Sequence, residues 1–391
     1  MNVPKLRFKE FNDEWKTHKL SDIGEFLKGG KLNKSDLSLN GIPCILYGEL
    51  YTFYNEFATR IKSKTFTTSN LVLSKKYDIL LPLSGETAED ISTCTCVFFD
   101  NIALGGDLLI FRNSLANSLF ISLLLKYKYK YKIAQIAQGK SVVHINIKNL
   151  KNIKVNLPPL EEQNKLSNFL FVINKKIENL ENTITSLENQ KKGLLQQIFS
   201  QKLRFKDKNG NNYPNWEKKK LEDISNITMG QSPDSDFVNN EKIGTPFLQG
   251  NAEFTNKYPI EKYWCTKPQK IANSTDILLS VRAPVGAINI ANKEFCIGRG
   301  LSAISFNCNK LFGKYNLEFN LFQLIKKSQG STFSSINKKD ISEIILFIPC
   351  LEEQTKIADF LSAFDRKLEN QKAQLEHWKQ IKKGLLQQMF V

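Results

Sequence analysis

Histidine is scarce in this sequence of 391 residues, and cysteine pairs with CxxC spacing are missing. The three histidines, His18, His144 and His377, are too few and too scattered for a metal cluster or a catalytic triad. The seven cysteines are an odd number, and no two of them have CxxC spacing. These absences argue against a zinc site and predict a protein whose thiols are reduced.

Long apolar runs and nucleotide-binding fingerprints are also missing. No stretch of about 18 apolar residues is present, and residues 1–7 lack the apolar core of a signal peptide. We therefore expect a cytoplasmic protein with no membrane partner. Gly139-Lys140-Ser141 resembles the end of a P-loop, but Ala134 stands where that motif needs its first glycine. No GxGxxG follows a predicted strand, and no Asn-Pro-Pro-aromatic segment of the amino-methyltransferase type occurs. We predict that the chain is not an enzyme and holds no cofactor.

The charge of the chain is far from balanced. Lysine and arginine number 55 against 39 aspartate and glutamate residues, which gives a formal net charge of +16 and a pI near 9.3. An excess of this size favours a polyanionic partner, and double-stranded DNA is the partner we expect.

Two segments of the sequence occur twice at a constant offset. Leu-Glu-Glu-Gln at 160–163 returns at 351–354, and Lys-Lys-Gly-Leu-Leu-Gln-Gln at 191–197 returns at 382–388. Each copy lies 191 residues after the first, so the two halves align here without a gap. Lys-Leu-Arg-Phe-Lys near the N-terminus also returns, at 202–206. The chain therefore contains an internal repeat, in which the second half repeats segments of the first.

The repeated segments have the pattern of long helices. Apolar residues recur in alternating steps of four and three, which is typical of a coiled-coil seam and predicts helices from Leu160 to Phe199 and from Leu351 onward. Each would be roughly 60 Å long at 1.5 Å per residue. Because residue 201 starts the second globular segment at once, parallel helices would force that segment to carry the chain back by this length, so we predict antiparallel packing. Two lysines at equivalent seam positions, Lys191 and Lys382, are expected to snorkel. Amphipathic helices docked on a globular core are the alternative.

The segments between the helices read as two similar modules. Strands are predicted at 72–73, 79–83, 95–99 and 108–111, and helices at 115–138 and 311–329, each ended by a glycine cap. The predicted fold class is α+β, with two similar mixed α/β modules separated by two long antiparallel coiled-coil helices in a pseudo-two-fold internal repeat. The predicted domains are residues 1–158, 159–200, 201–348 and 349–391.

Basic, aromatic and polar residues on turn-rich loops are the candidates for DNA contact. Arginine, in particular, can bind guanine or phosphate through two hydrogen bonds. The candidates are Lys28, Lys31, Tyr47, Lys140 and Ser141 in the first module and Gln231, Ser232, Arg282, Arg299 and Ser331 in the second. A solvated loop charge is the alternative at each position. Residues 126–132 alternate lysine and tyrosine, which favours either a nucleic-acid face or packing of Tyr127 and Tyr131 on one side of a helix.

Four segments resemble parts of the specificity subunit of type I restriction–modification enzymes, three of them its repeated elements and the last a frequent segment of its recognition domains. The resemblance covers essentially the whole chain. The four segments are Pro-Leu-Glu-Glu-Gln at 159–163, Pro-Cys-Leu-Glu-Glu-Gln at 349–354, the closing Lys-Lys-Gly-Leu-Leu-Gln-Gln, and the segment from Asp276 to Gly286. The first module departs from the last of these, with Leu-Ser-Gly-Glu-Thr at 83–87, so a role of Arg282 does not carry over to it.

The resemblance implies a non-catalytic reader of a bipartite, asymmetric DNA site. It implies two methylation subunits bound along the helices and a restriction subunit that translocates DNA and joins for cleavage. S-adenosylmethionine, ATP and Mg are implied for those partners only. The candidates for partner contact are Glu161, Glu162, Gln163, Glu352, Glu353 and Gln354. Two alternatives stay open: a stand-alone DNA methyltransferase with an unrecognised site, and a structural DNA-binding scaffold.

Overall fold

The structure is a computed structural model that describes residues 4–139, 142–255, 258–328 and 336–390. The chain forms two compact units. Unit 1 consists of Met1–Glu181 with Gln374–Val391, and unit 2 of Asn182–Ala373. Each unit therefore combines one module with parts of both long helices, and we call the modules module 1 and module 2. No helix in the described part of the chain is both long and apolar enough to cross a membrane.

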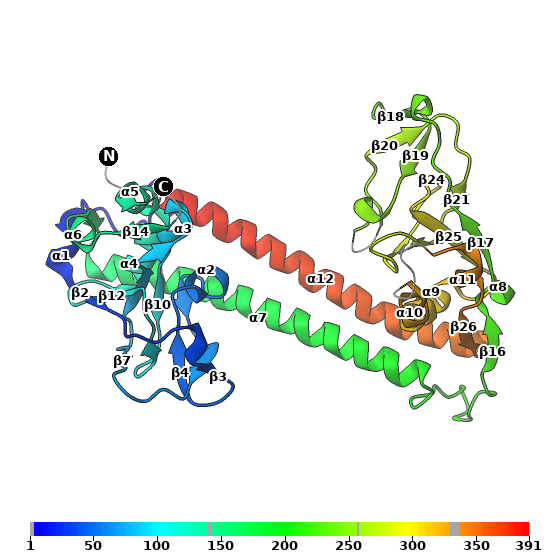
Figure 1. The fold of residues 1–391 in the computed structure, drawn as a ribbon, viewed down its shortest axis with the longest axis horizontal. Helices are drawn as coiled ribbons and strands as arrows, with labels where there is room; N and C mark the ends of the chain where they lie inside the picture. The colour runs from blue at the N-terminus through cyan, green and yellow to red at the C-terminus, as the bar shows by residue number, and fades with distance from the viewer. Residues whose placement is uncertain (1–3, 140–141, 256–257, 329–335, 391) are drawn as a thin grey trace. The chain divides into compact units, whose positions relative to one another are not determined.

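Module 1, drawn in blue and cyan in Figure 1, is built on two five-stranded sheets. Their strand orders are β2-β12-β8-β10-β5 and β3-β6-β4-β11-β7. Alternating apolar side chains of both sheets form a shared core, which includes Ile45, Leu80, Val97 and Ile110. The strands are β2 Gly24–Lys28, β3 Leu37–Ser38, β4 Ile42–Ile45, β5 Phe57–Ala58, β6 Ser63–Thr65, β7 Val72–Leu73, β8 Ile79–Pro82, β10 Thr95–Val97, β11 Ala103–Leu104 and β12 Leu108–Asn113. All four predicted strands are confirmed.

Smaller elements complete unit 1. Strand β1 (Lys16–Lys19) pairs with β15 (Lys154–Leu157) just before the first long helix. A three-stranded sheet has the order β13-β14-β9. The remaining elements are β9 Ser84–Gly85, β13 Ala137–Gln138, β14 Val143–Ile145, α1 Leu20–Ile23, α2 Glu49–Thr52, α3 Ala88–Ile91, α4 Ser118–Tyr127, α5 Lys130–Gln135 and α6 Ile147–Lys151.

The helix predicted at 115–138 is wrong in detail, because it is broken between α4 and α5. Tyr127 and Tyr129 both turn into the protein: Tyr127 bonds the buried Glu56, and the Tyr129 hydroxyl accepts the Asn156 N–H at 2.9 Å. A continuous helix would place them about 200° apart, so the break is what lets both be used. Tyr131 is exposed and does not pack beside Tyr127. The predicted glycine cap is wrong too, since residue 139 follows β13.

Module 2 repeats the two-sheet plan, with orders β17-β25-β22-β23 and β18-β20-β19-β24-β21, and β16 pairs with β26. The strands are β16 Glu217–Lys220, β17 Ser225–Met229, β18 Val238–Asn239, β19 Thr245–Leu248, β20 Tyr263–Cys265, β21 Ile271–Ala272, β22 Ile277–Ser280, β23 Ile288–Ile290, β24 Phe295–Ile297, β25 Leu301–Phe306 and β26 Ile345–Ile348. The helices are α8 Leu221–Ile224, α9 Lys310–Asn320, α10 Phe322–Ser328 and α11 Lys338–Ser342. The helix predicted at 311–329 is thus also two helices, and its predicted cap, Gly330, lies outside the described residues.

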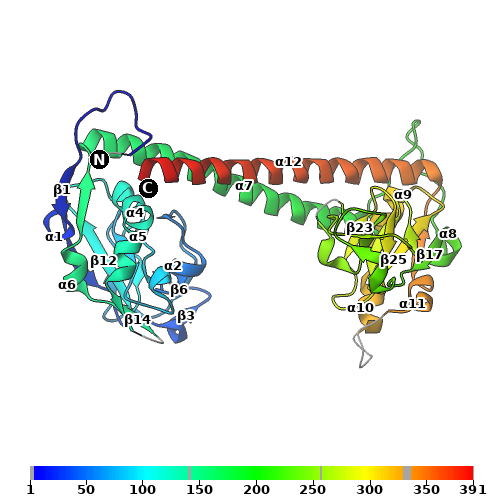
Figure 2. The ribbon, with the colours of Figure 1, turned by 90° about the horizontal axis from the view of Figure 1, so that it is seen from above.

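The two long helices are confirmed as α7 (Leu160–Phe199) and α12 (Leu351–Phe390). In unit 2 they are antiparallel, because Glu188 pairs with Lys372 at 2.7 Å whereas Lys191 pairs with Asp365 at 2.6 Å. In unit 1 the end of α12 lies beside α4 and the first half of α7 (Figure 2). The seam of α7 is buried as predicted, at Leu166, Leu170, Ile173, Ile177, Leu180, Ile184, Leu187 and Ile198. The predicted fold class, α+β modules with two long antiparallel helices, is confirmed.

The start of each long helix is clamped to its module by a buried glutamate. Glu162 is fully buried and binds Arg7 through Nε–Oε1 and Nη2–Oε2 bonds of 2.7 Å each. In unit 2, Glu353 is fully buried and binds Arg204 at 3.1 and 2.7 Å. Two parallel charge-assisted bonds fix the direction of the helix as well as its position. We call each pair an Arg–Glu clamp.

The glutamine that follows each clamp ties the long helix to the start of a module helix. The Gln163 side chain accepts the Asn117 N–H at 2.9 Å and donates to Pro158 O at 2.8 Å. Gln354 does the same with Asn309 N–H and Pro349 O, at 3.1 and 2.9 Å. Asn117 and Asn309 are the N-caps of α4 and α9. The repeated Leu-Glu-Glu-Gln therefore positions each module on its helix.

Candidate nucleic-acid interface

Four loops of module 2 meet where strands β17, β19, β22 and β24 end. We call this meeting point junction 2 and define it as residues 230–232, 249–250, 281–282 and 298–300. Backbone bonds hold it together: Gly230 N–H donates to Leu301 O at 2.9 Å, and Val281 N–H to Gly300 O at 2.9 Å. Gly298 N–H donates to the last residue of β19 at 2.8 Å. The polar side chains of these loops are thus presented from a fixed backbone.

Module 1 has the same junction, formed by residues 29–31, 46–47, 83–84 and 105–107. In this junction 1, Gly29 N–H donates to Leu108 O at 2.8 Å, and Leu83 N–H to Asp107 O at 2.7 Å. Gly105 N–H donates to the last residue of β4 at 2.9 Å. Bond for bond, these match the contacts of junction 2, so the two modules share one backbone frame at this point.

The close approach of two loops requires glycine in both junctions. A Cβ on Gly230 would lie 2.1 Å from Gly298 O, and a Cβ on Gly29 would lie 2.0 Å from Gly105 O. Neither distance is possible without moving backbone. The first loop of each junction is therefore fixed in place, while the residues after the glycine are free to differ.

The structure brings together all four described candidates of module 2. Gln231, Arg282 and Arg299 are exposed, and the half-buried Ser232 lies among them. Ser232 Oγ accepts hydrogen bonds from the Arg299 backbone N–H at 3.3 Å and from Arg299 Nε at 3.4 Å. These side chains therefore form one surface, and Ser331 lies outside the described residues.

In module 1, Lys31 and Tyr47 belong to junction 1, and Lys28 is the last residue of β2 beside it. Both lysines are exposed. The Tyr47 ring is 38% exposed and meets the Tyr51 ring edge to face at 6.4 Å. Lys140 and Ser141 lie outside the described residues.

One further polar residue of junction 2 was missed from the sequence. Gln249 is exposed, and its side-chain Nε2 donates to Ser232 Oγ at 3.0 Å. The available signal was its place directly after a strand and before Gly250. The pairing that makes this place significant, β19 parallel to β24, joins strands far apart in the sequence.

The candidates for partner contact fall into two groups. Glu162, Gln163, Glu353 and Gln354 are buried, and their polar atoms are used by contacts within the chain. These contacts connect each module to its long helix. Glu161 and Glu352 are exposed. Binding of a partner by the helix starts stays a prediction, and the exposed surface offered for it is Glu161 and Glu352.

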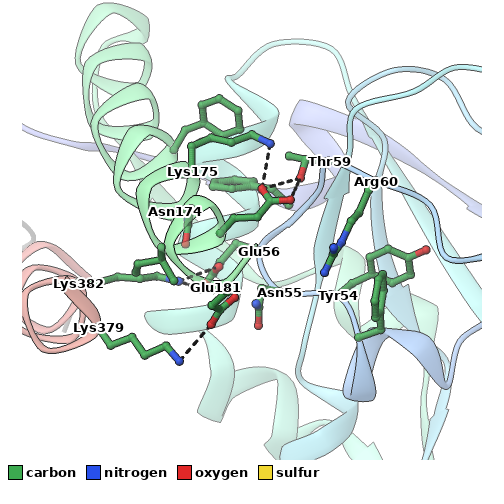
Figure 3. Close-up of a pocket in the computed structure, with 15 residues that line it drawn as sticks. Tyr54, Asn55, Glu56, Thr59, Arg60, Asn174, Lys175, Glu181, Lys379 and Lys382 are labelled. Carbon is green, nitrogen blue, oxygen red and sulfur yellow. Dashed lines mark hydrogen bonds and ion pairs between the residues drawn. The ribbon is translucent and has the colours of Figure 1, made fainter. Parts of the chain in front are cut away.

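A polar cavity of about 360 Å³ lies in unit 1 between module 1, α7 and the end of α12 (Figure 3). Three of its lysines are paired with carboxylates, so the charges in the cavity largely cancel. The pairs are Lys382–Glu56 at 2.8 Å, Lys379–Glu181 at 3.1 Å and Lys175–Glu178 at 2.9 Å. The cavity is therefore a network that fastens α7, α12 and module 1 to each other.

The two seam lysines do not snorkel to water but reach carboxylates. Lys382 binds Glu56, which is 2% exposed and also accepts a hydrogen bond from the Tyr127 hydroxyl. Burial raises the pKa of Glu56, but the charges of Lys126 and Lys382 and the two hydrogen bonds outweigh it and lower that pKa to about 2. Burial and the Glu56 charge raise the pKa of Tyr127. Glu56 is therefore ionised wherever the chain is folded near neutral pH.

The other seam lysine has a different carboxylate partner. Lys191 binds Asp365 of α12, whose Oδ2 accepts a hydrogen bond from the Tyr315 hydroxyl at 2.7 Å. Each half thus joins a seam lysine, a carboxylate and a module tyrosine, but the carboxylate comes from module 1 in one half and from α12 in the other. Among the described residues, no group of three or more His, Cys, Asp and Glu side chains is placed to hold a metal.

Comparison with known proteins agrees with this duplicated architecture. The family model for the type I restriction modification DNA specificity domain matches residues 12–189 and 213–377. The chain is 32% identical over 410 residues to the putative type I restriction enzyme MjaX specificity subunit of Methanocaldococcus jannaschii, covering 98% of this chain and 95% of the relative. It is 24% identical over 405 residues to the MjaVIII specificity subunit of the same organism, covering 96% and 91%.

Two solved structures share the fold over the whole chain. The S subunit of a type I restriction–modification system from M. genitalium matches with a TM-score of 0.70 at 17% identity, over 100% of this chain and 99% of that one. A chain from a structure of the assembly and conformational transition of a type I R-M system matches with a TM-score of 0.58 at 23% identity, over 98% and 99%.

Proposed function

Because the chain belongs to the type I restriction modification DNA specificity family, we propose that it is the specificity subunit of a type I restriction–modification system and reads a DNA site in two parts. The observation that carries this is the double match of the family model, once on each module. Each match contains one loop junction, and each module is held to the long helices by its own Arg–Glu clamp. One module therefore serves one half-site.

Junctions 1 and 2 are the surfaces that we propose contact DNA. Their backbone frame is shared, and their side chains differ: Lys31, Leu46 and Gly106 in one, and Ser232, Gln249 and Arg299 in the other. Since side chains read base edges in the grooves, equal frames with unequal side chains support two different half-sites. The net charge of +16 supplies the attraction to phosphate that holds the duplex.

The partners that we propose are methylation and restriction subunits, with two methylation subunits for one copy of this chain. The internal repeat supports this number, because each half repeats the helix segments of the other. The methyl donor, ATP and Mg would then be held by those subunits, and this chain would supply recognition alone. Glu161 and Glu352, exposed at equivalent places on α7 and α12, are the residues that we assign to partner contact.

The test combines the chain with the methylation subunit of its system, S-adenosylmethionine and duplex DNA whose methylated adenines are then mapped. We expect methylation at a two-part site with a constant gap, and none with either protein alone. Methyl transfer by this chain alone would overturn the proposal in favour of a stand-alone methyltransferase. Failure to form a complex, together with DNA binding that does not weaken as salt rises, would instead favour a scaffold.

A further inference from the structure

Most arginines of this chain are committed to contacts inside it. The sequence contains seven arginines. Three bind buried carboxylates through two bonds each: Arg7 with Glu162, Arg112 with Asp78, and Arg204 with Glu353. Two others have looser contacts: Arg60 lies over the Phe53 ring at 5.0 Å, and Arg366 donates to Ser362 at 3.3 Å. The remaining two, Arg282 and Arg299, both belong to junction 2.

The contacts of Arg299 fix the direction of its side chain but use only part of its hydrogen-bonding capacity. Its Nε and backbone N–H point to Ser232 Oγ, while the two Nη atoms have no hydrogen bond or ion pair within the residues that the structure describes. The side chain is also exposed. Arginine has five N–H donors in a planar fork, so the outer edge of this fork is available to a ligand while its inner edge sets the direction.

Ser232 also positions a second side chain, Gln249, beside Arg299. Gln249 Nε2 lies 3.0 Å and Oε1 3.1 Å from Ser232 Oγ. A neutral amide has two N–H donors and two acceptor sites. One of each faces Ser232, so one N–H and one acceptor site remain for a ligand, and because they point in different directions each can make a single bond. Gln249 Nε2 and Arg299 Nε are both within 3.4 Å of the same oxygen atom. Their separation is therefore less than two base-pair steps of about 3.4 Å each, and the two side chains address one base pair or two adjacent ones.

We propose that Arg299 and Gln249 form a purine-reading pair, which recognises a guanine and an adenine at the same or adjacent base pairs of the half-site of module 2. The inference rests on the proposed DNA-reading function. Arginine matches the O6 and N7 acceptors of guanine. Gln249 can bind adenine through one bond, by accepting from N6 or donating to N7 with the acceptor site or the N–H that Ser232 leaves open. Ser232 is a positioning residue, because it fixes both side chains and leaves open the outer edge of Arg299 and one donor and one acceptor of Gln249.

Junction 1 lacks this pair. The module 1 residue equivalent to Gln249 is Leu46, which lies against Gly105 as Gln249 lies against Gly298. The residue equivalent to Arg299 is Gly106, the residue after Gly105. Leu46 is buried, and a glycine presents no side chain. The purine pair is therefore assigned to the half-site of module 2, and the half-site of module 1 is read by other groups, such as Lys31 and Tyr47.

The test is selection of bound sequences from a random duplex library by the full chain together with its methylation subunit. For Arg299→Ala we expect the preference for guanine to fall roughly 5-fold to 100-fold at one position. Gln249→Glu keeps the size of the side chain but accepts where the amide donated, so we expect adenine to be replaced by cytosine at one position. Ser232→Ala should relax both positions together without a change in charge. The half-site of module 1 should stay the same in all three variants.

Lys339→Ala is the matched control, since it removes one positive charge from a side chain of module 2 that is 83% exposed and lies outside the junction. It should leave every base preference unchanged. The inference is overturned if Arg299→Ala weakens binding equally for all sequences, as loss of a phosphate contact would. It is also overturned if Gln249→Glu leaves the motif unchanged. A wild-type selection that yields no two-part motif would instead overturn the proposed function itself.

Discussion

Module 1 and module 2 are held to the long helices by the same contacts, but equivalent polar residues inside the two modules have different hydrogen-bond partners. Both use an Arg–Glu clamp and a glutamine tied to an N-cap. Inside, Asp78 of module 1 binds Arg112 through two bonds of 2.9 and 2.8 Å, whereas the equivalent Asp276 has a buried oxygen, Oδ1, with no partner among the described residues. The contacts made by repeated residues have been kept, and those made by the interior have diverged.

The difference teaches where the chain can vary. A clamp joins two repeated segments, so a change in either copy would leave a charge buried without a partner, which is strongly destabilising. The candidate side chains of the junctions are exposed to solvent. A substitution there changes the groups available to a ligand but has little effect on stability. We expect the largest effects on stability at the clamps and the smallest at positions where one module has already lost the contact.

Breaking the clamps should have the largest effect. We expect Arg7→Ala and Arg204→Ala each to lower the unfolding free energy of the affected unit by about 3–5 kcal/mol, because a buried carboxylate loses its partner. Arg204→Ala should cost less, since Trp216 Nε1 still donates to Glu353 at 3.0 Å. Hydrogen exchange of peptides from each unit in the full chain measures this. Lys165→Ala, which breaks an exposed pair with Glu10, is the control and should cost below about 1 kcal/mol.

The seam lysines should differ between the halves. We expect Lys382→Ala to destabilise unit 1 by about 3 kcal/mol, because Glu56 is buried and would be left charged. Lys191→Ala should destabilise unit 2 by only about 1 kcal/mol, because the Asp365 side chain is 27% exposed and water can replace the lysine. Equal losses in the two units, read from the same exchange experiment, would contradict the comparison.

The pH dependence should separate the halves further. The folded pKa of Glu56 is lowered from its ordinary value of 4.5 to about 2, so its contribution to stability is complete above about 4.5 and is lost as the pH falls toward 2. Urea unfolding of wild type and Lys382→Ala at several pH values should therefore show a gap that is largest above pH 4.5 and closes toward pH 2. A gap that stays constant over this window would exclude Glu56 as the cause.

A graft can restore the contact that module 2 lacks. Ser305 occupies the strand position of Arg112, since residues 111 and 304 pair with Ile79 and Ile277 in the two sheets. We expect Ser305→Arg to give Asp276 a partner and to stabilise unit 2 by about 1.5 kcal/mol. Ser305→Lys, which adds the charge without the fork, should give less. Unchanged stability of both variants in thermal unfolding would show that the site cannot accept the pair.

The equivalent tryptophans should show the smallest difference. Trp216 Nε1 donates to Glu353, whereas Trp15 Nε1 is buried and has no partner in the part of the chain that the structure describes. We expect Trp216→Phe to cost about 1 kcal/mol more than Trp15→Phe, because only the first loses a hydrogen bond to a charged group. Chemical unfolding of the two variants measures this. A larger loss for Trp15→Phe would mean that packing, and not the indole N–H, decides at both sites.

Much of the frame could be predicted because its signals are local. The heptad steps of α7 are a pattern within one continuous segment, and the repeat is found by comparing two such segments. The bounds and the direction of the long helices could therefore both be predicted. The break between α4 and α5 was not, because it depends on Glu56 and Asn156 as partners for two tyrosines. A helix pattern alone cannot show which ring finds a partner elsewhere in the chain.

The candidate site could be predicted in its parts but not in its arrangement. Gln231, Ser232, Arg282 and Arg299 were found by residue type and turn context, and the structure places them together. Gln249 was missed because its significance comes from the parallel pairing of β19 with β24 and from the oxygen of Ser232. The contact made by Glu162 could not be predicted either, since only the fold brings it to Arg7, 155 residues away in the sequence.

The backbone joint near the two ends of the chain governs how the protein would carry mechanical load. Leu6 N–H donates to Gln388 O at 3.1 Å, just as Leu203 N–H donates to Gln197 O at 3.0 Å. The second joint is also bridged by the chain itself, whereas the first is held by non-covalent contacts, which include the packing of Phe390 on Phe120 and the Lys382–Glu56 pair. Tension between the two ends would therefore peel the last turns of α12 from unit 1 before any force reached unit 2. The equivalent backbone hydrogen bond would therefore break under load in unit 1 and stay intact in unit 2.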